Sequence, residues 1–361
     1  MANRKPNILV AALDWGLGHA TRLIPIIKEL RNNNCNIILA ASGNALHYWI
    51  QEFPDNTIIE LPAYNPVYHA HGNMNLSMVL QAPKFLHTIY VENQLLKKIV
   101  REHHIHGIIS DNRYGLFHSN IPCVIITHQL FIQTPRHLNF LKPVIEKINF
   151  SFINRFSQCW VPDFEDENNI SGILSHSATK PANTKYIGIL SRLKNENIPI
   201  ENDILVLLSG PEPQRTVLEN ILLKQLQPLK KNILLVRGNN SVPELKNIPT
   251  HIKVMPLLTS SELNTVINQS AFVVCRSGYS TIMDLVTTAK PALLVPTPGQ
   301  TEQLYLAELM KDKGWFNAQL QPKINLHEAL LNKDQYKPAL NQHTTELLSN
   351  TVIEFIREVC R

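Results

Sequence analysis

Cysteine is scarce in this sequence of 361 residues, and it never occurs as a close pair. The five cysteines stand singly, with no Cys-x-x-Cys, which excludes a zinc cluster and argues against a disulfide framework. The 15 histidines lack an H-E-x-x-H pattern and carboxylate partners at ligand spacing. No Asp-x-Asp pair is present either. The sequence therefore predicts chemistry that uses neither a metal ion nor another cofactor.

Charge and long apolar runs are scarce as well. Only 17% of the residues are charged, the formal net charge is +5, and no basic run carries interleaved aromatic residues, so we expect no nucleic-acid partner. No stretch reaches the ~18 consecutive apolar residues of a membrane-spanning helix. The first residues are polar and lead into an apolar run of strand length, which does not fit a signal peptide. We expect a cytoplasmic protein.

Apolar residues make up 44% of the chain, and they gather in strand-length runs that alternate with helical patterns. This alternation occurs twice, which predicts an α/β protein with two doubly wound parallel sheets. We expect a first domain over residues 1–190, a second over 191–340, and a helical tail over 341–361. The expected strands are 7–13, 36–41, 57–60, 107–110, 123–127 and 158–162, then 204–208, 232–237, 252–255, 271–275 and 291–295.

The stretch 275–303 carries the clearest functional signal. An apolar strand ends in Arg276 and a turn of small residues, and a helical pattern follows. This order of elements aims backbone N–H groups and a positive helix end at an anion, most commonly a phosphate. Asp284 lies one turn into the helix, where its carboxylate could accept hydrogen bonds from ribose hydroxyls. The next strand ends in a second polar loop, and both loops lie where doubly wound sheets bind ligands.

This window resembles the donor-binding half of GT-B glycosyltransferases, most closely the family 28 group that contains the MurG-type enzymes. The family pattern is S-G-x-x-[ST], an acidic residue in the helix, G-x-P, then a loop that ends in [DE]-Q. The family usually has Glu at the place of Asp284 and Gly at the place of Ala289. The resemblance implies two Rossmann-like domains facing a cleft, with the last helix crossing back to the first domain. The matching residues are Ser277, Gly278, Ser280, Thr281, Asp284, Lys290, Pro291, Glu302 and Gln303.

The first strand runs into a loop with the form G-x-G-H-x-x-[RP], which begins at Gly16 and contains Gly18 and His19. The two glycines permit a tight turn and the close approach of an acceptor. The loop resembles the first loop of family 28 and of UDP-glucuronosyltransferase-like enzymes. In the latter the matching His is the general base, a role that suits an imidazole at neutral pH. His19 could instead cap or pack the first helix.

Two further residues end strands of the first half. Asp111 follows the strand 107–110, and the UDP-glucuronosyltransferase-like resemblance implies that it holds His19. An ordinary turn or helix-capping Asp is the alternative. His128 ends the next strand and is a rival for the acid–base role.

Three loop regions of the second half are additional donor-site candidates. Ser209 and Gly210 follow its first strand, where family 28 enzymes place a Gly-rich loop beside the diphosphate. Arg215 could add a charge-assisted contact there, or lie exposed. Arg237 ends the next strand, where it could contact the nucleotide or turn the chain. Arg276 could meet the phosphate charge.

Residues 137–157 place Leu, Ile and Phe among Lys and Arg at helical spacing. A buried amphipathic helix of the first domain is the favoured interpretation. A peripheral membrane face is the alternative, and it would suit a lipid-linked acceptor.

The sequence thus predicts a metal-independent glycosyltransferase that moves a hexosyl group from a UDP-linked nucleotide sugar to an unidentified acceptor in envelope or surface glycan synthesis. Two alternatives stay open, a UDP-sugar 2-epimerase of the same fold and a nucleotide-sugar-binding protein without activity. A lipid-linked acceptor would bring this cytoplasmic protein to the inner membrane face.

Overall fold

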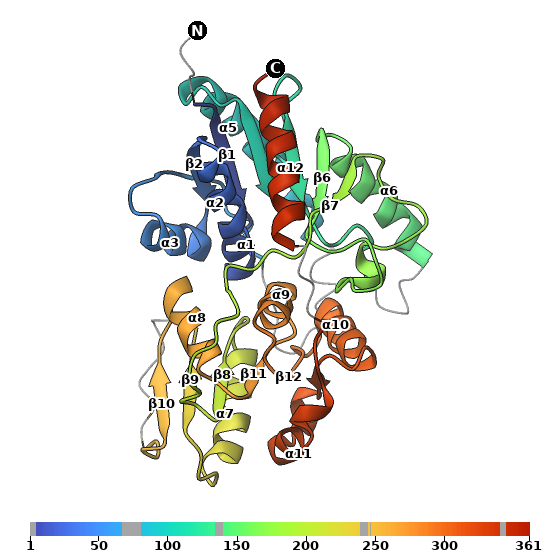
Figure 1. Cartoon of the computed structure of the whole chain (residues 1–361). Helices are drawn as coiled ribbons and strands as arrows, with labels where there is room; N and C mark the ends of the chain where they lie inside the picture. The colour runs from blue at the N-terminus through green and yellow to red at the C-terminus, as the bar shows by residue number, and fades with distance from the viewer. Residues whose placement is uncertain (1–4, 67–80, 134–139, 239–244, 246, 340–343) are drawn as a thin grey trace. The chain divides into compact units, whose positions relative to one another are not determined.

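The computed structural model describes residues 5–66, 81–133, 140–238, 245, 247–339 and 344–361. The described residues form two compact units (Figure 1). The first holds the residues up to Leu190 together with the C-terminal helix, and the second holds the residues from Ser191 to 339. Among the described residues no helix has the length and apolar character to cross a bilayer.

The first unit contains a parallel sheet of seven strands in the order β3-β2-β1-β4-β5-β6-β7. Its central strands are apolar and buried along nearly their whole length, as expected for a parallel sheet covered on both faces. The strands are β1 Asn7–Ala12, β2 Asn36–Ala41, β3 Thr57–Glu60, β4 Gly107–Asp111, β5 Cys123–Ile126, β6 Gln158–Val161 and β7 Thr184–Tyr186.

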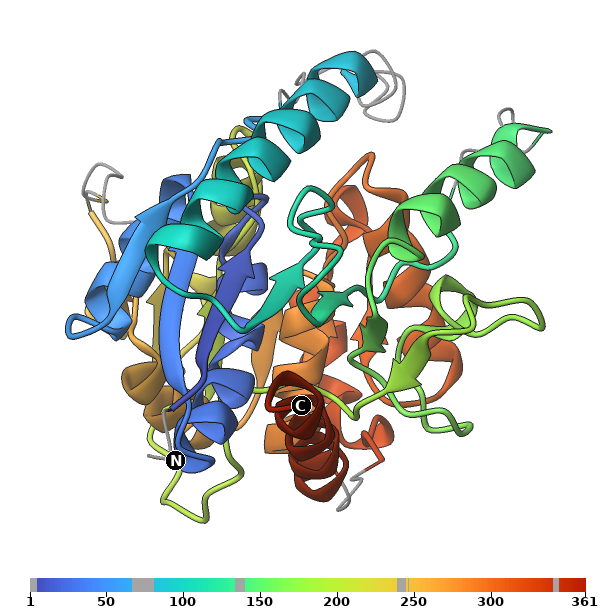
Figure 2. The same cartoon turned by 90° about the horizontal axis from the view of Figure 1, so that it is seen from above.

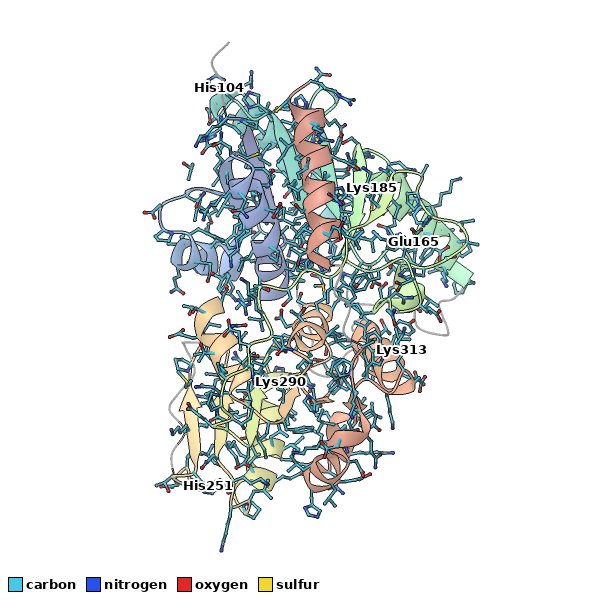
Figure 3. The ribbon with its side chains drawn as sticks, viewed as in Figure 1. His104, Glu165, Lys185, His251, Lys290 and Lys313 are labelled. Atoms are coloured by element: carbon cyan, nitrogen blue, oxygen red, sulfur yellow. The ribbon has the colours of Figure 1, made fainter. Side chains whose placement is uncertain are left out.

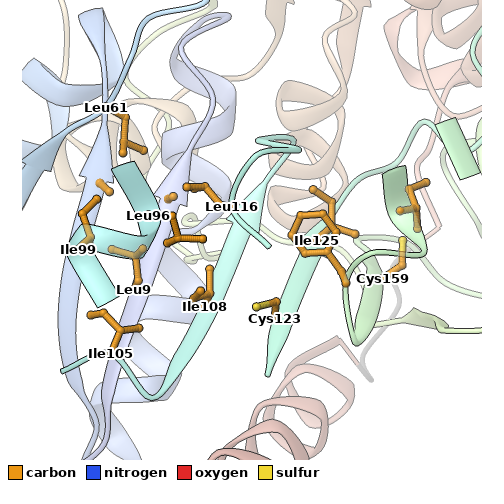
Figure 4. Close-up of a cluster of buried hydrophobic side chains, with 14 of the residues drawn as sticks. Leu9, Leu61, Leu96, Ile99, Ile105, Ile108, Leu116, Cys123, Ile125 and Cys159 are labelled. Atoms are coloured by element: carbon orange, nitrogen blue, oxygen red, sulfur yellow. The ribbon is translucent and has the colours of Figure 1, made fainter. Parts of the chain in front are cut away.

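Helices cover both faces of this sheet, and the alternation of side chains along β1 decides which residue meets which helix. Leu9 joins Leu96 and Ile99 of α5 in one apolar cluster (Figure 4). Ile8 points the other way, toward α12, which lies across the sheet from α5 (Figure 2). The helices are α1 Leu17–Arg22, α2 Ile24–Asn32, α3 Gly43–Glu52, α5 Ala82–Glu102, α6 Lys142–Ile153 and α12 Thr344–Val359.

The last helix, α12, packs on the first sheet through a close contact at Gly107. A Cβ at this glycine would lie 2.7 Å from Val359 and 2.9 Å from Phe355, so only glycine admits the helix at this depth. The Phe355 ring also meets Trp160 edge-on at 5.8 Å. At the rim Lys185, labelled in Figure 3, donates to Glu354 at 2.8 Å.

The second unit contains a parallel sheet of six strands in the order β10-β9-β8-β11-β12-β13. Its strands β8, β11 and β12 are neighbours, so the loops that follow them leave from one edge of the sheet. The strands are β8 Ile204–Leu207, β9 Ile233–Val236, β10 Ile252–Met255, β11 Val273–Cys275, β12 Ala292–Leu294 and β13 Asn317–Ala318. The helices are α7 Gln214–Leu226, α8 Ser260–Asn268, α9 Tyr279–Thr288, α10 Thr301–Asp312 and α11 Leu326–Leu331.

The prediction of two doubly wound parallel sheets is confirmed, with two strands added. Neither β7 nor β13 was predicted, and both are edge strands of two or three residues. Their residues are polar or half-buried, so they lack the continuous apolar run that identifies the central strands.

We expect that Phe355→Ala will destabilise the first unit by about 3–5 kcal/mol, the usual cost of emptying a buried phenylalanine site. Phe355 is fully buried. Truncating its ring removes the contact with Trp160 and leaves an empty space next to Gly107. Urea unfolding followed by tryptophan fluorescence measures the change. Leu347→Ala is the control, because Leu347 lies on the same helix but is 38% exposed. A loss below about 1 kcal/mol for Phe355→Ala would contradict the docking of α12.

Candidate active site

The loops after β1, β4 and β5 leave the first sheet side by side. The register pairs Ala12 of β1 with Asp111 of β4, and Asp111 with Ile126 of β5. After β1 the chain turns at Gly16, whose φ of 106° strains any residue with a side chain. Helix α1 starts directly afterwards and carries His19 toward Asp111.

His19 and Asp111 form a direct pair. The distance from His19 Nδ1 to Asp111 Oδ1 is 2.9 Å, and the carboxylate is fully buried while the imidazole is 17% exposed. Since an ionised carboxylate only accepts, Nδ1 carries the proton and the lone pair stays on Nε2. A base oriented by a carboxylate in this way is a common arrangement for abstracting a proton from a hydroxyl group.

Arg22 is the third member of this cluster, and the sequence analysis assigned it no role. Its Nε lies 2.5 Å from Asp111 Oδ2 and its Nη2 2.5 Å from Oδ1. Burial by itself would raise the pKa of Asp111, but Arg22 and His19 outweigh it and hold that pKa below its ordinary value. Asp111 is therefore anionic at neutral pH. The available signal was the spacing of three residues between His19 and Arg22, which places both on one face of a helix.

His128 belongs to the same cluster through Arg22. Its Nδ1 lies 3.2 Å from Arg22 Nη1, and its side chain is 4% exposed. The structure thus brings together His19, Asp111 and His128, all three of which the sequence analysis had named for the first half.

A second buried ion pair braces the same edge of the sheet. Arg113 donates from Nε to the carbonyl of Ala12 at 2.7 Å and from Nη1 to Glu92 at 2.5 Å. Glu92 also accepts from the Tyr64 hydroxyl at 3.0 Å. Burial raises the pKa of Glu92 despite these bonds. Arg113 lies two residues after Asp111, so it ties the end of β4 to β1 and α5.

In the second unit, two of the predicted donor loops are bonded to each other. Ser277 donates from its hydroxyl to the carbonyl of Gln303 at 2.8 Å, and the Thr297 N–H donates to the Gln303 side chain at 2.9 Å. A Cβ at Gly210 would lie 3.7 Å from the Thr297 hydroxyl. The loops after β8, β11 and β12 therefore meet, and Gly210 is followed by α7.

Helix α9 begins beside this meeting point. Its N-cap is Gly278, and no side chain of the described residues caps the helix, so the positive end of α9 is a suitable place for an anion. Ser280 and Thr281 lie in that first turn. Glu302 lies in the first turn of α10, and Ser209 is exposed just after β8.

Asp284 is bonded to a residue that the sequence analysis did not consider. Its Oδ1 accepts from the Ser191 hydroxyl at 2.5 Å. Burial raises the pKa of Asp284 to about 6, and Arg192 and the bond from Ser191 offset it only in part. The start of the second unit thus supplies two polar neighbours of the predicted ribose contact. Ser191 is 93 positions away from Asp284 in the sequence, and no local pattern indicated the pairing.

Arg276 is buried within the second unit. Its Nη2 donates to the Gln214 carbonyl at 2.8 Å, and its Nη1 donates to the carbonyls of Val295 and Pro296 at 3.3 Å. Burial lowers its pKa to about 10, so it stays charged at neutral pH. These bonds hold the loop after β12 against the start of α7. A contact with phosphate stays a prediction.

The other two predicted donor-site arginines have carboxylate partners. Arg215 donates from Nε and Nη2 to one oxygen of Glu212, at 2.9 and 2.5 Å. Arg237 donates to both oxygens of Glu219 at 2.6 and 2.7 Å, a bidentate pair that fixes the orientation of both side chains. Whether either arginine also contacts a nucleotide stays a prediction. Among the residues that the structure describes, no group of His, Cys, Asp and Glu side chains has the arrangement of a metal site.

Comparison with known proteins agrees with this architecture. Residues 212–358 match the model of the glycosyltransferase family 28 C-terminal domain. An uncharacterized glycosyltransferase of Methanosarcina acetivorans is 22% identical over 324 residues, which are 86% of this chain and 84% of that protein. The UDP-N-acetylglucosamine--N-acetylmuramyl-(pentapeptide) pyrophosphoryl-undecaprenol N-acetylglucosamine transferase of Natranaerobius thermophilus is 22% identical over 334 residues, 87% of this chain and 86% of that protein.

Solved structures share the fold. The Acinetobacter baumannii MurG structure has a TM-score of 0.59 at 14% identity and covers 97% of this chain and 100% of its own. The glycosyltransferase SnogD of Streptomyces nogalater has a TM-score of 0.65 at 12% identity and covers 99% of this chain and 100% of its own. The two sheets therefore make a GT-B fold, and the resemblance noted in the sequence is confirmed.

We expect Asp284→Asn to stabilise the protein without nucleotide at neutral pH. The pKa of Asp284 is about 6 in the folded state against an ordinary value of 3.8. Between these values the folded state holds the extra proton, so stability is lost as the pH rises toward 6. The gain from the amide should be on the order of 1–3 kcal/mol above pH 6 and vanish below about pH 4.

Thermal unfolding between pH 4 and 8 measures this gain. Asp312→Asn is the control, an exposed aspartate of the same unit, for which we expect a change within about 0.5 kcal/mol. If Asp284→Asn is destabilising at pH 7.5, the carboxylate contributes more to the fold than its burial costs, and the expectation fails.

Proposed function

We propose that this chain, a glycosyltransferase of the GT-B type with a family 28 C-terminal domain, moves a hexosyl group from a UDP-linked sugar to an acceptor hydroxyl without a metal ion. The observation that carries the proposal is the pair formed by His19 and Asp111, 2.9 Å apart beside the Gly16 turn. A relative that spans most of the chain is named for transfer from UDP-N-acetylglucosamine, which supports the choice of donor.

In the proposed reaction the first unit supplies the base. The acceptor hydroxyl gives its proton to His19 Nε2 as its oxygen bonds to the anomeric carbon of the sugar. Asp111 stabilises the imidazolium that forms. The bond between the sugar and the UDP phosphate oxygen breaks at the same time, and UDP leaves with the bonding electron pair.

The second unit holds the donor in this proposal. The negative charge that develops on the diphosphate is met by the backbone N–H groups between Ser277 and Thr281 and by the positive end of α9. Asp284 accepts from the ribose hydroxyls, and Glu302 accepts from the hydroxyls of the sugar. Such preorganised donors replace the cation that other nucleotide-sugar enzymes use.

Helix α6 favours an acceptor at a membrane surface. Val144 and Ile148 are four residues apart in this helix, which places them on one face, and they are 55% and 52% exposed; Phe140, just before the helix, is 73% exposed. Lys142 and Lys147 lie near this apolar stripe. The prediction of a buried helix holds for one side of α6 only, the side that buries Asn149 and Ile153. Residues 137–139 of the predicted segment lie outside the described residues.

An exposed apolar stripe with lysines beside it suits the headgroup region of an anionic bilayer. The relative from Natranaerobius thermophilus is named for an acceptor on pyrophosphoryl-undecaprenol, which supports a lipid-linked acceptor here too. In this proposal the protein is cytoplasmic and binds peripherally to the inner membrane face during envelope or surface glycan synthesis.

The donor and the base are tested together. UDP should raise the melting temperature of wild type and of His19→Ala equally, because a ligand that binds only the folded state adds about 2.7 kcal/mol at a hundredfold excess over Kd. EDTA should leave the shift intact. Release of UDP from UDP-sugars, measured with a membrane lipid extract as acceptor source, should fall about 10²–10⁴-fold in His19→Ala, and less in Asp111→Asn.

Each alternative predicts a different result. A UDP-sugar 2-epimerase would return an epimerised UDP-sugar with no acceptor present, and a binding protein would shift its melting temperature and release no UDP. The absence of any shift with UDP or another nucleoside diphosphate would remove the donor site from the proposal. His19→Ala activity within a few-fold of wild type would remove His19 as the base.

The membrane contact is tested by sedimentation with vesicles. We expect binding to phosphatidylglycerol-rich vesicles, weak binding to pure phosphatidylcholine, and a loss of at least tenfold in Val144→Glu/Ile148→Glu, because each carboxylate must be dehydrated against an anionic surface. Leu331→Glu is the control, an exposed apolar residue of the second unit. Equal binding by both variants would show that α6 is not the contact.

A further inference from the structure

We propose that Arg22 is a positioning residue for the cluster of His19, Asp111 and His128. Arg22 holds Asp111 in place and fixes His128 as the neutral Nε2–H tautomer, so that within this cluster His19 is the histidine that accepts the proton. The proposal rests on the proposed function for its kinetic consequence. Its central claim concerns the protonation of two histidines, which can be measured without any substrate.

The guanidinium of Arg22 contacts three side chains at once. Nε and Nη2 donate to the two oxygens of Asp111 at 2.5 Å each, and Nη1 donates to His128 Nδ1 at 3.2 Å. The third side chain is His19, whose Nδ1 lies 3.2 Å from Nη2. The Arg22 side chain is 1% exposed and Asp111 is fully buried, so bulk water does not compete for these bonds. Arginine only donates and stays protonated in proteins, so the direction of each bond is known.

For His128 the consequence is a single tautomer. Because Arg22 Nη1 donates, His128 Nδ1 must carry the lone pair, and the proton of the neutral ring is on Nε2. The lone pair of His128 is thereby occupied, and a second proton on Nδ1 would face a cationic donor at 3.2 Å. With its proton on Nε2, the neutral ring has no lone pair at that nitrogen and cannot accept a proton there.

The guanidinium of Arg22 also lies close to the ring of His19. Nδ1–H donates to Asp111, whereas Arg22 Nη2 lies 3.2 Å from the same nitrogen, and two donors cannot bond to each other. Nδ1–H therefore keeps its bond to Asp111, and the contact with Arg22 is not a hydrogen bond. Arg22 keeps Asp111 anionic, and the anionic carboxylate in turn holds the ring proton of His19 on Nδ1.

A purely structural brace is the competing explanation, and the same unit contains one for comparison. Arg113 is buried and donates to Glu92, to the Ser42 hydroxyl and to the carbonyls of Ala12 and Pro62 rather than to either histidine. Loss of Arg113 should therefore lower stability while the histidine tautomers stay as they are. Loss of Arg22 should change the tautomers as well.

The closing experiment is ¹⁵N NMR of the histidine rings in the full-length protein at pH 7, assigned with His19→Gln and His128→Gln. In wild type we expect a neutral Nε2–H ring for His128 and a protonated Nδ1 for His19. A His128 that is cationic, or that carries its proton on Nδ1, overturns the proposal. This readout stands even if no transferase activity is ever found.

Two substitutions then separate charge from geometry. Arg22→Lys keeps the cation but cannot reach Asp111 and His128 together, so His128 should exchange between tautomers, while Arg113→Lys should leave both rings unchanged. Arg22→Met also removes the charge, and turnover should fall while the KM for the donor stays within twofold. Guanidinium at millimolar concentration should restore part of the lost turnover in Arg22→Ala.

If Arg22→Lys leaves His128 in one tautomer, or Arg113→Lys disturbs it as much, Arg22 is only a brace. Where Arg22→Met does not fold, the wild-type and Arg22→Lys spectra still decide. Failure of the proposed function would appear differently, as correct tautomers in a protein that releases no UDP.

Discussion

The first unit depends on one buried carboxylate. Asp111 ends β4 with no exposure to solvent, and a buried charge persists only when it is paired and hydrogen-bonded. Arg22 and His19 provide that pairing, and both come from the single short helix that the Gly16 turn starts. The position of α1, the orientation of the His19 ring and the tautomer of His128 all follow from the need to satisfy Asp111.

In the second unit the pKa of the buried carboxylate, Asp284, is shifted in the opposite direction from that of Asp111. Burial raises the pKa of Asp284 to about 6, because Ser191 and Arg192 compensate its charge only in part, whereas Asp111 is held below its ordinary pKa by a direct arginine fork. The difference suits the two proposed roles. A carboxylate that orients a base must already be ionised, while one that binds ribose hydroxyls can gain its hydrogen bonds when the nucleotide arrives.

The arginines show what tertiary structure adds to residue type. Arg215, Arg237 and Arg276 were named as donor-site candidates because they end strands or begin helices beside the donor loops, and that role stays a prediction. Each is bonded to protein groups in the second unit. Arg22, which was given no role, lies at the centre of the first cluster. A guanidinium pairs with whichever acceptor the fold brings within reach, and that acceptor is 89 residues away for Arg22.

The sequence by itself determined the class of the fold, because buried parallel strands are continuous apolar runs and helices repeat every 3.6 residues, and both patterns are local. It also located the loops of both candidate sites, since strand ends, glycine turns and helix starts are read within a few residues. It missed β7 and β13, and it left open whether the apolar side chains of residues 137–157 are buried or exposed, because burial there depends on neighbours from elsewhere. Only the tertiary structure decided which side chains meet: His19 with Asp111, Arg22 with both and with His128, Ser191 with Asp284. Apart from His19 and Arg22, which share one short helix, these partners are separated by about 90 residues or more, and their pairing is set by strand order and register, which no local pattern contains.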